Sequence, residues 1–337
     1  MKKHAIIPIF ISHRGCPNDC VFCNQKKITA RQGDVTEEDI RNTITTYLST
    51  LNDMNMETIE LSFFGGSFTG IPIEEQSRFL AIAYEYKQRG IIDKIHMSTR
   101  PDYIDREILD NLRKYSVDVI ELGVQSFDDA VLEKSNRGHS AAAVYDACRL
   151  IKEYGFTLGI QLMIGLPGDS LESCIYSARE TVKIAPEIAR LYPTIIIEDT
   201  ELLEMYRRGE YSPLTLDEAV AVTKEMYRIL DAAGINIIRV GLKSTDIINE
   251  DGAITGGTYH PAFRQLVESS IAREEIEKQL TATSGNISVM CNPSDISNAA
   301  GHNGCNRKYF AGKYPGLHIS FKKEESLDRN KYIVIKC

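Results

Sequence analysis

Six short apolar runs separated by longer amphipathic stretches constrain the fold of this chain more than any other feature. The runs are continuous rather than alternating, which is typical of parallel strands buried on both faces. They occupy residues 6–11, 59–64, 95–98, 117–125, 157–167 and 190–197. Helical patterns follow at residues 36–50, 74–89, 103–115, 140–154, 170–185 and 199–208, and a helix (215–233) and a strand (235–240) close the unit. Six successive β–α units predict an α/β fold, either a right-handed parallel barrel or an open doubly wound sheet.

The start of the first helix has a local signal of its own. Thr36 is followed three positions later by Asp39, just ahead of the apolar residues Ile40, Ile44 and Leu48. A hydroxyl residue with an acidic residue three positions on predicts a helix N-terminus.

Net charge and the lengths of the apolar runs indicate the cell compartment that we expect for this chain. The formal net charge of the 337 residues is −8, so the whole molecule has no general attraction for nucleic acid or for an anionic membrane. No apolar run approaches the ~20 residues that span a bilayer. The N-terminal "MKKHAIIPIF" has too short an apolar core for a signal peptide. We expect a cytoplasmic protein with no membrane partner, whose cysteines are thiols or metal ligands rather than disulfides.

The predicted strands end in unusual residues. "GGSFTG" follows the second strand, "STRPD" the third, "GVQSF" ends the fourth and "GLPGDS" the fifth. Because sites in parallel α/β folds lie beyond the carboxyl ends of the strands, we expect these loops to face the same side.

Three of the eight cysteines, Cys16, Cys20 and Cys23, lie within eight residues, directly after the first strand. A zinc site closed by protein normally takes four ligands. Zinc therefore stays an alternative that needs a fourth ligand from His13, Cys148, Cys174, Cys291 or Cys305. A disulfide and a chance cluster of structural thiols also stay open.

A 4Fe-4S cluster with one open iron explains why this loop has three cysteines and not four. Clusters that only transfer electrons use four cysteines, whereas three cysteines hold three irons and leave the fourth open. An open iron can chelate the amine and the carboxylate of a small molecule such as S-adenosylmethionine. One electron delivered to the sulfonium then breaks a C–S bond and releases a 5′-deoxyadenosyl radical, while the protein fixes the geometry.

The segment "CPNDCVFC" resembles the three-cysteine motif of the radical SAM enzymes. Over about residues 5–240 the chain resembles the radical SAM part of the Elongator catalytic subunit and, more distantly, oxygen-independent coproporphyrinogen oxidase. Further support comes from "GGSFTG", "TRPD", "GVQSFDDAVLEKSNRGHS", "MIGLPGDS" and "LYPTIIIEDTELLEMYRRGEY". The resemblance implies a partial parallel (β/α)6 barrel with a small C-terminal extension. It also implies a 4Fe-4S cluster on Cys16, Cys20 and Cys23, with S-adenosylmethionine as the second cofactor.

The resemblance also implies residues that bind S-adenosylmethionine. Gly65, Gly66 and Ser67 would bring bare backbone against the methionine amine, where a Cβ would clash. Arg137 would pair with the methionine carboxylate through its two-pronged guanidinium. The other implied contacts are Phe22 near the adenine, Gln125 at the ribose or carboxylate, Gln161 near the nucleoside, Ser98 where the relatives usually have Glu, and Arg100. Taken singly, the glycines can form a turn, Arg137 can be a surface cation, and Gln125 and Ser98 can cap strands.

The sequence after residue 241 differs from the barrel. We expect domains at 1–241 and 242–337, because the Gly-, Asp- and Asn-rich stretch 242–261 is typical of a boundary. The last part lacks the "Q/RxxGxG/A" loop of the acetyltransferase domain that the Elongator catalytic subunit carries.

Residues 286–337 have a charge of about +4, from eight Lys/Arg and four Asp/Glu. Basic and aromatic residues interleave there and can contact RNA, or form a small β-rich cap with ordinary exposed lysines.

Three functions stay open at this stage. The first is a radical SAM enzyme that acts on tRNA or another RNA, with an electron donor such as flavodoxin or ferredoxin. The second is a radical SAM enzyme that acts on a small metabolite or a porphyrin. The third is a haem or iron-sulfur carrier without catalytic activity. The nearest resemblance and the basic C-terminal part favour the first.

Overall fold

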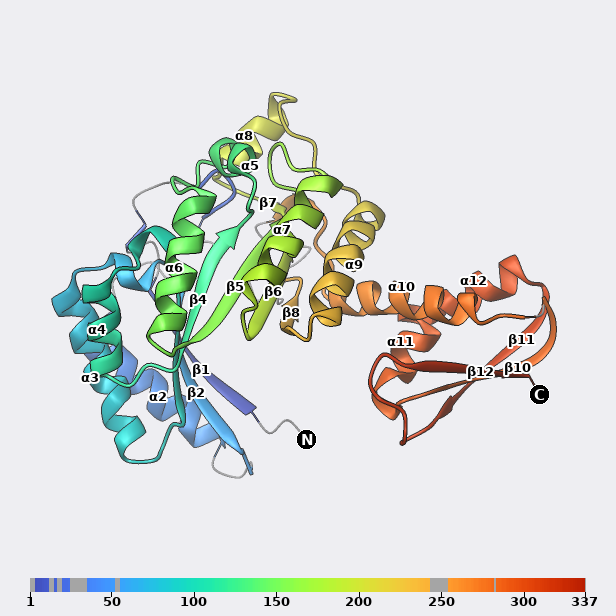
Figure 1. Cartoon of the computed structure of the whole chain (residues 1–337), viewed down its shortest axis with the longest axis horizontal. Helices are drawn as coiled ribbons and strands as arrows, with labels where there is room; N and C mark the ends of the chain where they lie inside the picture. Colours follow the sequence, from blue (N-terminus) through green and yellow to red (C-terminus); the bar gives the residue numbers. More distant parts are fainter. Residues whose placement is uncertain are drawn as a thin grey trace.

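Seven parallel strands form the main sheet of the computed structural model, which describes residues 4–11, 15–16, 20–24, 35–51, 55–242, 254–281 and 283–336 (Figure 1). The strands are β1 (His4–Phe10), β2 (Thr58–Phe64), β3 (Lys94–Thr99), β4 (Val119–Gln125), β5 (Thr157–Ile164), β6 (Ile188–Pro193) and β8 (Asn236–Val240). Their order in the sheet follows the chain, and each pairing is parallel. A doubly wound sheet would reverse its order at an internal strand. The order therefore confirms the predicted partial barrel, with β1 and β8 at its two edges.

Helices between the strands cover the outer face of this curled sheet (Figure 1). They are α2 (Glu37–Leu51), α3 (Ile73–Gln88), α4 (Arg106–Lys114), α5 (Asp129–Lys134), α6 (Ala141–Glu153), α7 (Leu171–Ile184) and α9 (Leu216–Ala232), with two 3₁₀ turns, η1 (Phe68–Gly70) and η2 (Pro101–Tyr103). The predicted start of α2 is confirmed. The Thr36 hydroxyl accepts the Asp39 backbone N–H at 3.1 Å, and the Asp39 carboxylate accepts the Thr36 N–H at 2.9 Å.

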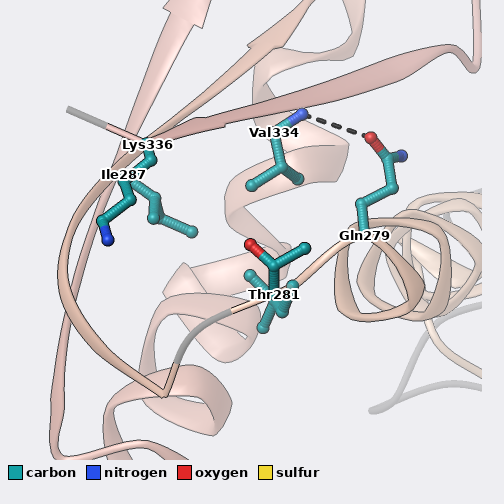
Figure 2. A pocket seen from close by; sticks show the side chains of 6 residues that line it. Gln279, Thr281, Ile287, Val334 and Lys336 are labelled. Carbon is teal, nitrogen blue, oxygen red and sulfur yellow. Dashed lines mark hydrogen bonds between the residues drawn. The ribbon is translucent and has the colours of Figure 1, made fainter.

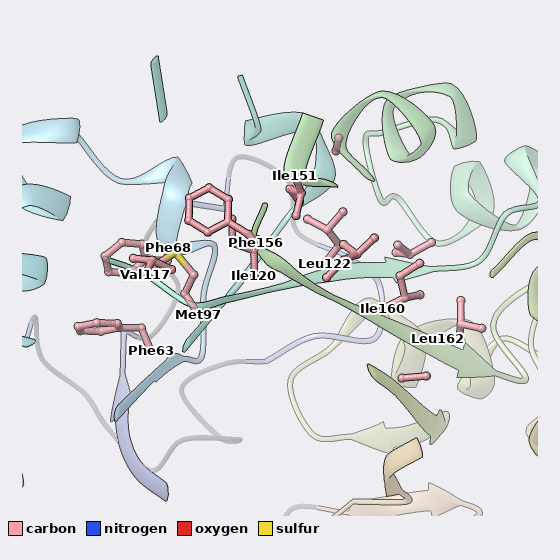
Figure 3. Packing of buried hydrophobic residues seen from close by; sticks show 14 of the residues in the cluster. Phe63, Phe68, Met97, Val117, Ile120, Leu122, Ile151, Phe156, Ile160 and Leu162 are labelled. Carbon is pink, nitrogen blue, oxygen red and sulfur yellow. The ribbon is translucent and has the colours of Figure 1, made fainter. Parts of the chain in front are cut away.

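The main core lies between the sheet and these helices (Figure 3). Alternate residues of each strand point into it, for example Ile120 and Leu122 of β4, and Leu158 and Ile160 of β5, all fully buried. Ile151 of α6 closes the core from the helix side. Such burial stabilises by roughly 1.5–3 kcal/mol per side chain, so the core holds the strand ends at fixed spacings.

The concave face of the barrel is polar, which the continuous apolar runs did not predict. The intervening strand positions carry polar residues, of which Glu60 on β2, His96 on β3 and Glu121 on β4 are buried and Arg190 on β6 has 11% of its side chain exposed. His96 Nδ1 lies 2.7 Å from a Glu60 carboxylate oxygen, and Arg190 Nε lies 2.6 Å from a Glu121 oxygen. His96 Nε2 also lies 3.8 Å from a Glu121 oxygen, so these contacts form one polar network across the strands.

Glu60 and Arg190 owe their charged states to this network. Burial disfavours the Glu60 carboxylate, but the hydrogen bond and charge of His96, with help from Ser62 and His4, lower its pKa to about 2. Burial also disfavours the Arg190 guanidinium, yet Glu121 and the Tyr192 hydroxyl outweigh it and raise the Arg190 pKa. Both groups are therefore ionised at neutral pH.

The sixth predicted strand, residues 190–197, is two strands. β6 ends at Pro193, and β7 (Ile195–Ile197) leaves the barrel sheet to pair antiparallel with β9 (Ile254–Gly257). Gly257 has a φ of +92° and its Cα lies so close to Ile195 that an added Cβ would be 3.0 Å from the Ile195 Cα. α8 (Glu201–Arg207) follows β7 and packs beside it.

A separate small unit follows, with its own core. Its sheet has the order β11-β10-β12, from β10 (Ser284–Cys291), β11 (Gly316–Lys323) and β12 (Tyr332–Lys336). The remaining elements are η3 (Pro293–Asp295), α11 (Ile296–Ala300), η4 (His302–Gly304) and α12 (Cys305–Lys313). The three strands agree with the β-rich character predicted for this part of the chain, and whether it acts as a cap stays a prediction. A small pocket on it is lined by Gln279, Leu280, Thr281, Ile287, Val334 and Lys336, where the Gln279 side chain accepts the Val334 N–H (Figure 2).

One helix, α10 (Phe263–Lys278), belongs to both units. Phe263 and Val267 lie in the barrel core, whereas Ala272 and Ile276 lie in the core of the small unit. The predicted boundary between residues 241 and 242 adjoins residues 243–253, which lie outside the described part of the chain, and it stays a proposal. No helix of the described residues is long and apolar enough to cross a bilayer.

Candidate functional site

The cysteine loop follows β1 and packs against the loop that follows β2. Gly15 has a φ of +73°, and an added Cβ would lie 2.1 Å from the Ser67 carbonyl oxygen. In return, a Cβ on Gly70 would lie 2.2 Å from the Gly15 carbonyl oxygen. Only two glycines allow the two backbones to come this close, so they set the position of Cys16. This pair was not recognised in the sequence, because its two members are 55 positions apart.

A second set of contacts holds the rest of the loop. The Val21 N–H donates to the Ser135 carbonyl at 3.2 Å, and the Val21 carbonyl accepts the Leu202 N–H at 2.7 Å. Val21 is buried with Leu202 and Leu203, and Phe22 packs against this cluster. The loop is therefore tied to the ends of α5 and α8, far along the chain.

Arg137 joins the cysteine loop to β4. Its Nη1 donates to the Cys20 sulfur at 3.1 Å and its Nη2 donates to the Gly123 carbonyl at 2.5 Å. Arg100 supports it, because Arg100 Nη2 donates to the Arg137 carbonyl at 2.6 Å while Asp102 binds the Arg100 guanidinium through two bonds of 2.9 Å. Both guanidiniums are buried, with 6% and 3% of the residue exposed. Two buried guanidiniums, one of them paired with Asp102, thus lie beside the cysteine loop.

Cys16, Cys20 and Cys23 differ in environment. Cys20 is buried, whereas Cys16 and Cys23 are partly exposed. Burial raises the pKa of the Cys16 thiol and the neighbouring Cys20 adds to this, although Arg100, Arg137 and a backbone hydrogen bond from Ser67 act in the opposite direction. Among the residues that the structure describes, no three His, Cys, Asp or Glu side chains are grouped so that they could hold a single metal ion. The zinc alternative gains no support there, and its ligand candidate His13 lies outside the described residues.

Gln125, the last residue of β4, lies together with Gln161 from within β5. Gln161 Nε2 donates to Gln125 Oε1 at 3.2 Å. Gln125 has a φ of +72°, which is unusual for a residue with a side chain, and it lies at an irregularity in the β4–β5 pairing. A Cβ on Gly123 would lie 3.0 Å from the Gln125 amide nitrogen and 3.5 Å from Arg137. Gln125 and Arg137 therefore both border Gly123, and backbone strain such as that of Gln125 is common at functional sites.

The remaining predicted residues lie around this centre. Gly65 and Gly66 are partly exposed after β2, and Gly65 has a φ of +98°. The Ser67 hydroxyl is fully buried, where it bonds Thr99 at 2.9 Å and accepts the Arg100 N–H at 3.2 Å. Ser98 is not joined to the cysteines. Its hydroxyl faces the barrel interior and donates to Glu121 at 3.4 Å.

Three buried polar atoms near Cys20 have no hydrogen-bond partner within the described residues. They are Arg100 Nη1, Arg137 Nε and His139 Nε2. Burial, followed by the positive charge of Arg137, lowers the pKa of His139 to about 4, so this imidazole is neutral at pH 7. Buried polar groups in native proteins are normally satisfied, so unpartnered donors on two guanidiniums fit an anionic group bound beside the thiols. His139, in "RGH" directly after Arg137, was missed in the sequence.

Loss of the close Gly15–Gly70 approach is expected to release the cysteine loop. Gly70→Ala places a methyl group onto the Gly15 carbonyl without any backbone strain, because Gly70 has no positive φ. We expect the purified variant to retain less than half of the wild-type iron after anaerobic reconstitution. Gly312→Ala is the matched control, since nothing lies within 4 Å of its added Cβ. Equal iron contents in the two variants would contradict this account of the loop.

Comparison with known proteins adds an independent line of evidence. Residues 10–180, just over half of the chain, match the radical SAM superfamily, and residues 186–273 match the radical SAM C-terminal domain. The tRNA uridine(34) acetyltransferase of Methanocaldococcus infernus is 28% identical over 257 residues, which cover 65% of this chain and 48% of that protein. Other matching relatives bear the name Elongator complex protein 3. The chain spans about half the length of the tRNA uridine(34) acetyltransferases that it matches.

Solved structures agree on the fold. The archaeal Elp3 of Methanocaldococcus infernus, with its N-terminus deleted, superimposes with a TM-score of 0.65 at 23% identity, over 81% of this chain and 64% of that chain. Coproporphyrinogen III oxidase (HemN) from Escherichia coli gives a TM-score of 0.50 at 18% identity, over 69% of this chain and 53% of that chain. Both resemblances that the motifs implied are confirmed.

Proposed function

Since the chain belongs to the radical SAM superfamily, we propose that Cys16, Cys20 and Cys23 hold the 4Fe-4S cluster that this superfamily uses together with S-adenosylmethionine. Support comes from the contact of Cys20 with Arg137 and from the two buried guanidiniums with unpartnered nitrogens beside it. When bound, the cluster supplies the electron that cleaves S-adenosylmethionine reductively to a 5′-deoxyadenosyl radical.

We further propose that the loops at the strand ends hold S-adenosylmethionine. Gly65, Gly66 and the Ser67 backbone would face its amine, and the Gln125–Gln161 pair would face its nucleoside. Phe22 would pack near the adenine from the cluster that anchors the cysteine loop. Arg100, whose Nη2 holds the Arg137 carbonyl, would present its unpartnered Nη1 to the ligand, and Ser98 would contact the ligand from its position beside Glu121.

The substrate that we propose is tRNA or another RNA. The printed name of the Methanocaldococcus infernus relative places that protein on tRNA uridine 34, and this chain covers about half of it. The small C-terminal unit is the basic part of an otherwise acidic chain. Its aromatic residues are mostly engaged within the protein, however. Phe310 is buried, and the Tyr309 and Tyr314 hydroxyls bind Glu277 at 3.0 and 2.9 Å. The lysines are therefore better candidates for RNA contact than the aromatic rings.

We also propose a location, an electron donor and a domain division for the enzyme. A cytoplasmic location agrees with seven free thiols among the described residues. An electron donor such as flavodoxin or ferredoxin would deliver the electron. The domain division would be a radical SAM barrel at 1–241 and a C-terminal unit at 242–337.

Anaerobic cleavage assays test the function directly. With the reconstituted protein, dithionite and S-adenosylmethionine, we expect 5′-deoxyadenosine to form, and to form faster when bulk tRNA is added. A rate of 5′-deoxyadenosine formation that does not change when tRNA is added would favour a small-molecule or porphyrin substrate. If the cluster is intact but no S-adenosylmethionine is cleaved, the enzymatic function is overturned, and the carrier function becomes the leading alternative.

Removing positive charge from the C-terminal unit is expected to weaken RNA binding. Lys308, Lys322 and Lys323 are exposed, whereas Lys313 is already paired with Glu277 at 2.9 Å. Replacing the three exposed lysines with glutamine should lower the slope of log affinity against log salt by about 0.7–0.9 for each phosphate that is no longer neutralised. The matched control replaces Arg89, Lys94 and Lys114, three exposed cations on the barrel, with glutamine. Identical slopes in both triple variants would exclude the C-terminal unit as the RNA surface.

A further inference from the structure

Arg137 is held in place before any ligand arrives. It follows α5 in a tight turn, in which the Arg137 N–H donates to the Leu132 carbonyl at 3.0 Å. The residues on either side, Asn136 and Gly138, both have positive φ angles, of 51° and 72°. Its carbonyl is fixed by Arg100, and Arg100 is fixed by Asp102. This buried guanidinium is therefore restrained through its backbone as well as through its side chain.

The directions of the Arg137 nitrogens decide what the side chain can bind. Nη1 donates to the Cys20 sulfur and Nη2 donates to the Gly123 carbonyl, so only Nε lacks a partner. A two-pronged pairing with a carboxylate needs two nitrogens of one guanidinium edge. Because each Nη nitrogen carries two hydrogens, the pairing implied by the resemblance would use Nε–H and the second N–H of one Nη, and it is compatible with the bond from Nη1 to Cys20.

We propose that Arg137 is a positioning residue that sets the reduction potential of the cluster through the sulfur of Cys20. This inference rests on the proposed function, because it requires the cluster to be on Cys20. A charged N–H donor to a ligating sulfur stabilises the electron-rich, reduced cluster, and hydrogen bonds and net charge at the sulfurs are established determinants of cluster potentials. Arg100, itself paired with Asp102, lies behind Arg137 and fixes its carbonyl. The arrangement makes the cluster easier to reduce, which the cleavage of a sulfonium requires.

The test is a reductive titration of the anaerobically reconstituted protein, without S-adenosylmethionine, followed by the electron paramagnetic resonance signal of the reduced cluster. Arg137→Met removes both the charge and the donor, whereas Arg137→Gln keeps a neutral donor. At the wild-type midpoint we expect the ratio of reduced to oxidised cluster to fall about tenfold in Arg137→Met, which corresponds to about 59 mV for one electron. Arg137→Gln should lie between Arg137→Met and the wild type.

Lys134→Gln is the matched control. Lys134 is an exposed cation at the end of the same helix, so its removal changes the local charge without touching the thiols, and the potential should stay at the wild-type value. S-Adenosylmethionine affinity is measured in parallel by equilibrium dialysis. An unchanged potential in either Arg137 variant that carries a full cluster would overturn the inference, above all if the affinity alone has fallen.

Two further outcomes are distinguishable. Loss of the cluster from both folded Arg137 variants would also overturn the inference, because it would assign Arg137 to cluster assembly. Failure of the wild type itself to take up a cluster would instead overturn the proposed function, before any Arg137 variant is measured.

Discussion

Replacing Cys20 with alanine is expected to abolish cluster binding and to reduce 5′-deoxyadenosine formation by more than about 100-fold, beyond the ~10–100-fold typical of residues that only support metal ligands. Cys20 is the most enclosed of the three thiols, with 8% of the residue exposed. Its removal leaves only two cysteine ligands for the proposed four-iron cluster. Arg137 Nη1 also loses the sulfur that accepts its hydrogen bond. Iron and sulfide content, the visible absorption of the cluster and product formation are measured on the same anaerobic preparation.

Cys305→Ala is the control for the loss of a thiol. Cys305 is exposed in the small C-terminal unit, and its substitution should change neither iron content nor cleavage. A Cys20→Ala protein that keeps both the cluster and the cleavage would show that the cluster is held elsewhere. The assignment of Cys16 and Cys23 would then be withdrawn as well.

The second large effect is expected in the barrel interior, from Arg190→Met. Glu121 is 2% exposed and has the Arg190 guanidinium at 2.6 Å, so the substitution buries a carboxylate without its main compensating charge. Removing one partner of a buried ion pair typically costs about 3–5 kcal/mol. We expect the free energy of unfolding to fall by that amount in anaerobic urea denaturation, with the m-value unchanged.

The double variant Glu121→Gln/Arg190→Met should recover most of this loss, because both charges are then absent. Arg113→Met serves as the control, since its pair with Asp110 is exposed on both sides and should cost less than about 1 kcal/mol. If Arg190→Met costs no more than Arg113→Met, the interior network does not stabilise the fold.

The strands, their order and the loops at their ends were predictable because each depends on short stretches of sequence. Runs such as 59–64 and 95–98 lie within one or two residues of β2 and β3, and the motifs after them do converge on Cys16, Cys20 and Arg137. The split of residues 190–197 into β6 and β7 was not predictable, because its cause is a pairing with β9 almost sixty positions later. The six residues of α5 are likewise too few to show a helical period.

The polar concave face left a signal that could have been read. Within the apolar runs the polar residues recur at every second position, as in Glu60 and Ser62, or His96 and Ser98. This period of two indicates one polar face, and not burial on both sides. In contrast, neither the approach of Gly15 to Gly70 nor the direction of the Arg137 nitrogens follows from any local pattern, since both depend on how distant loops meet.

The shared helix α10 also bears on how this chain can be recombined with others. In its first turns, Phe263 and Val267 pack in the barrel core. In its later turns, Ala272 and Ile276 pack in the core of the small unit. A chimera that joins a foreign C-terminal module to this barrel must therefore be spliced inside the helix, after Val267 and in phase with its turns. A junction at the preceding loop would carry two core residues away with the discarded module.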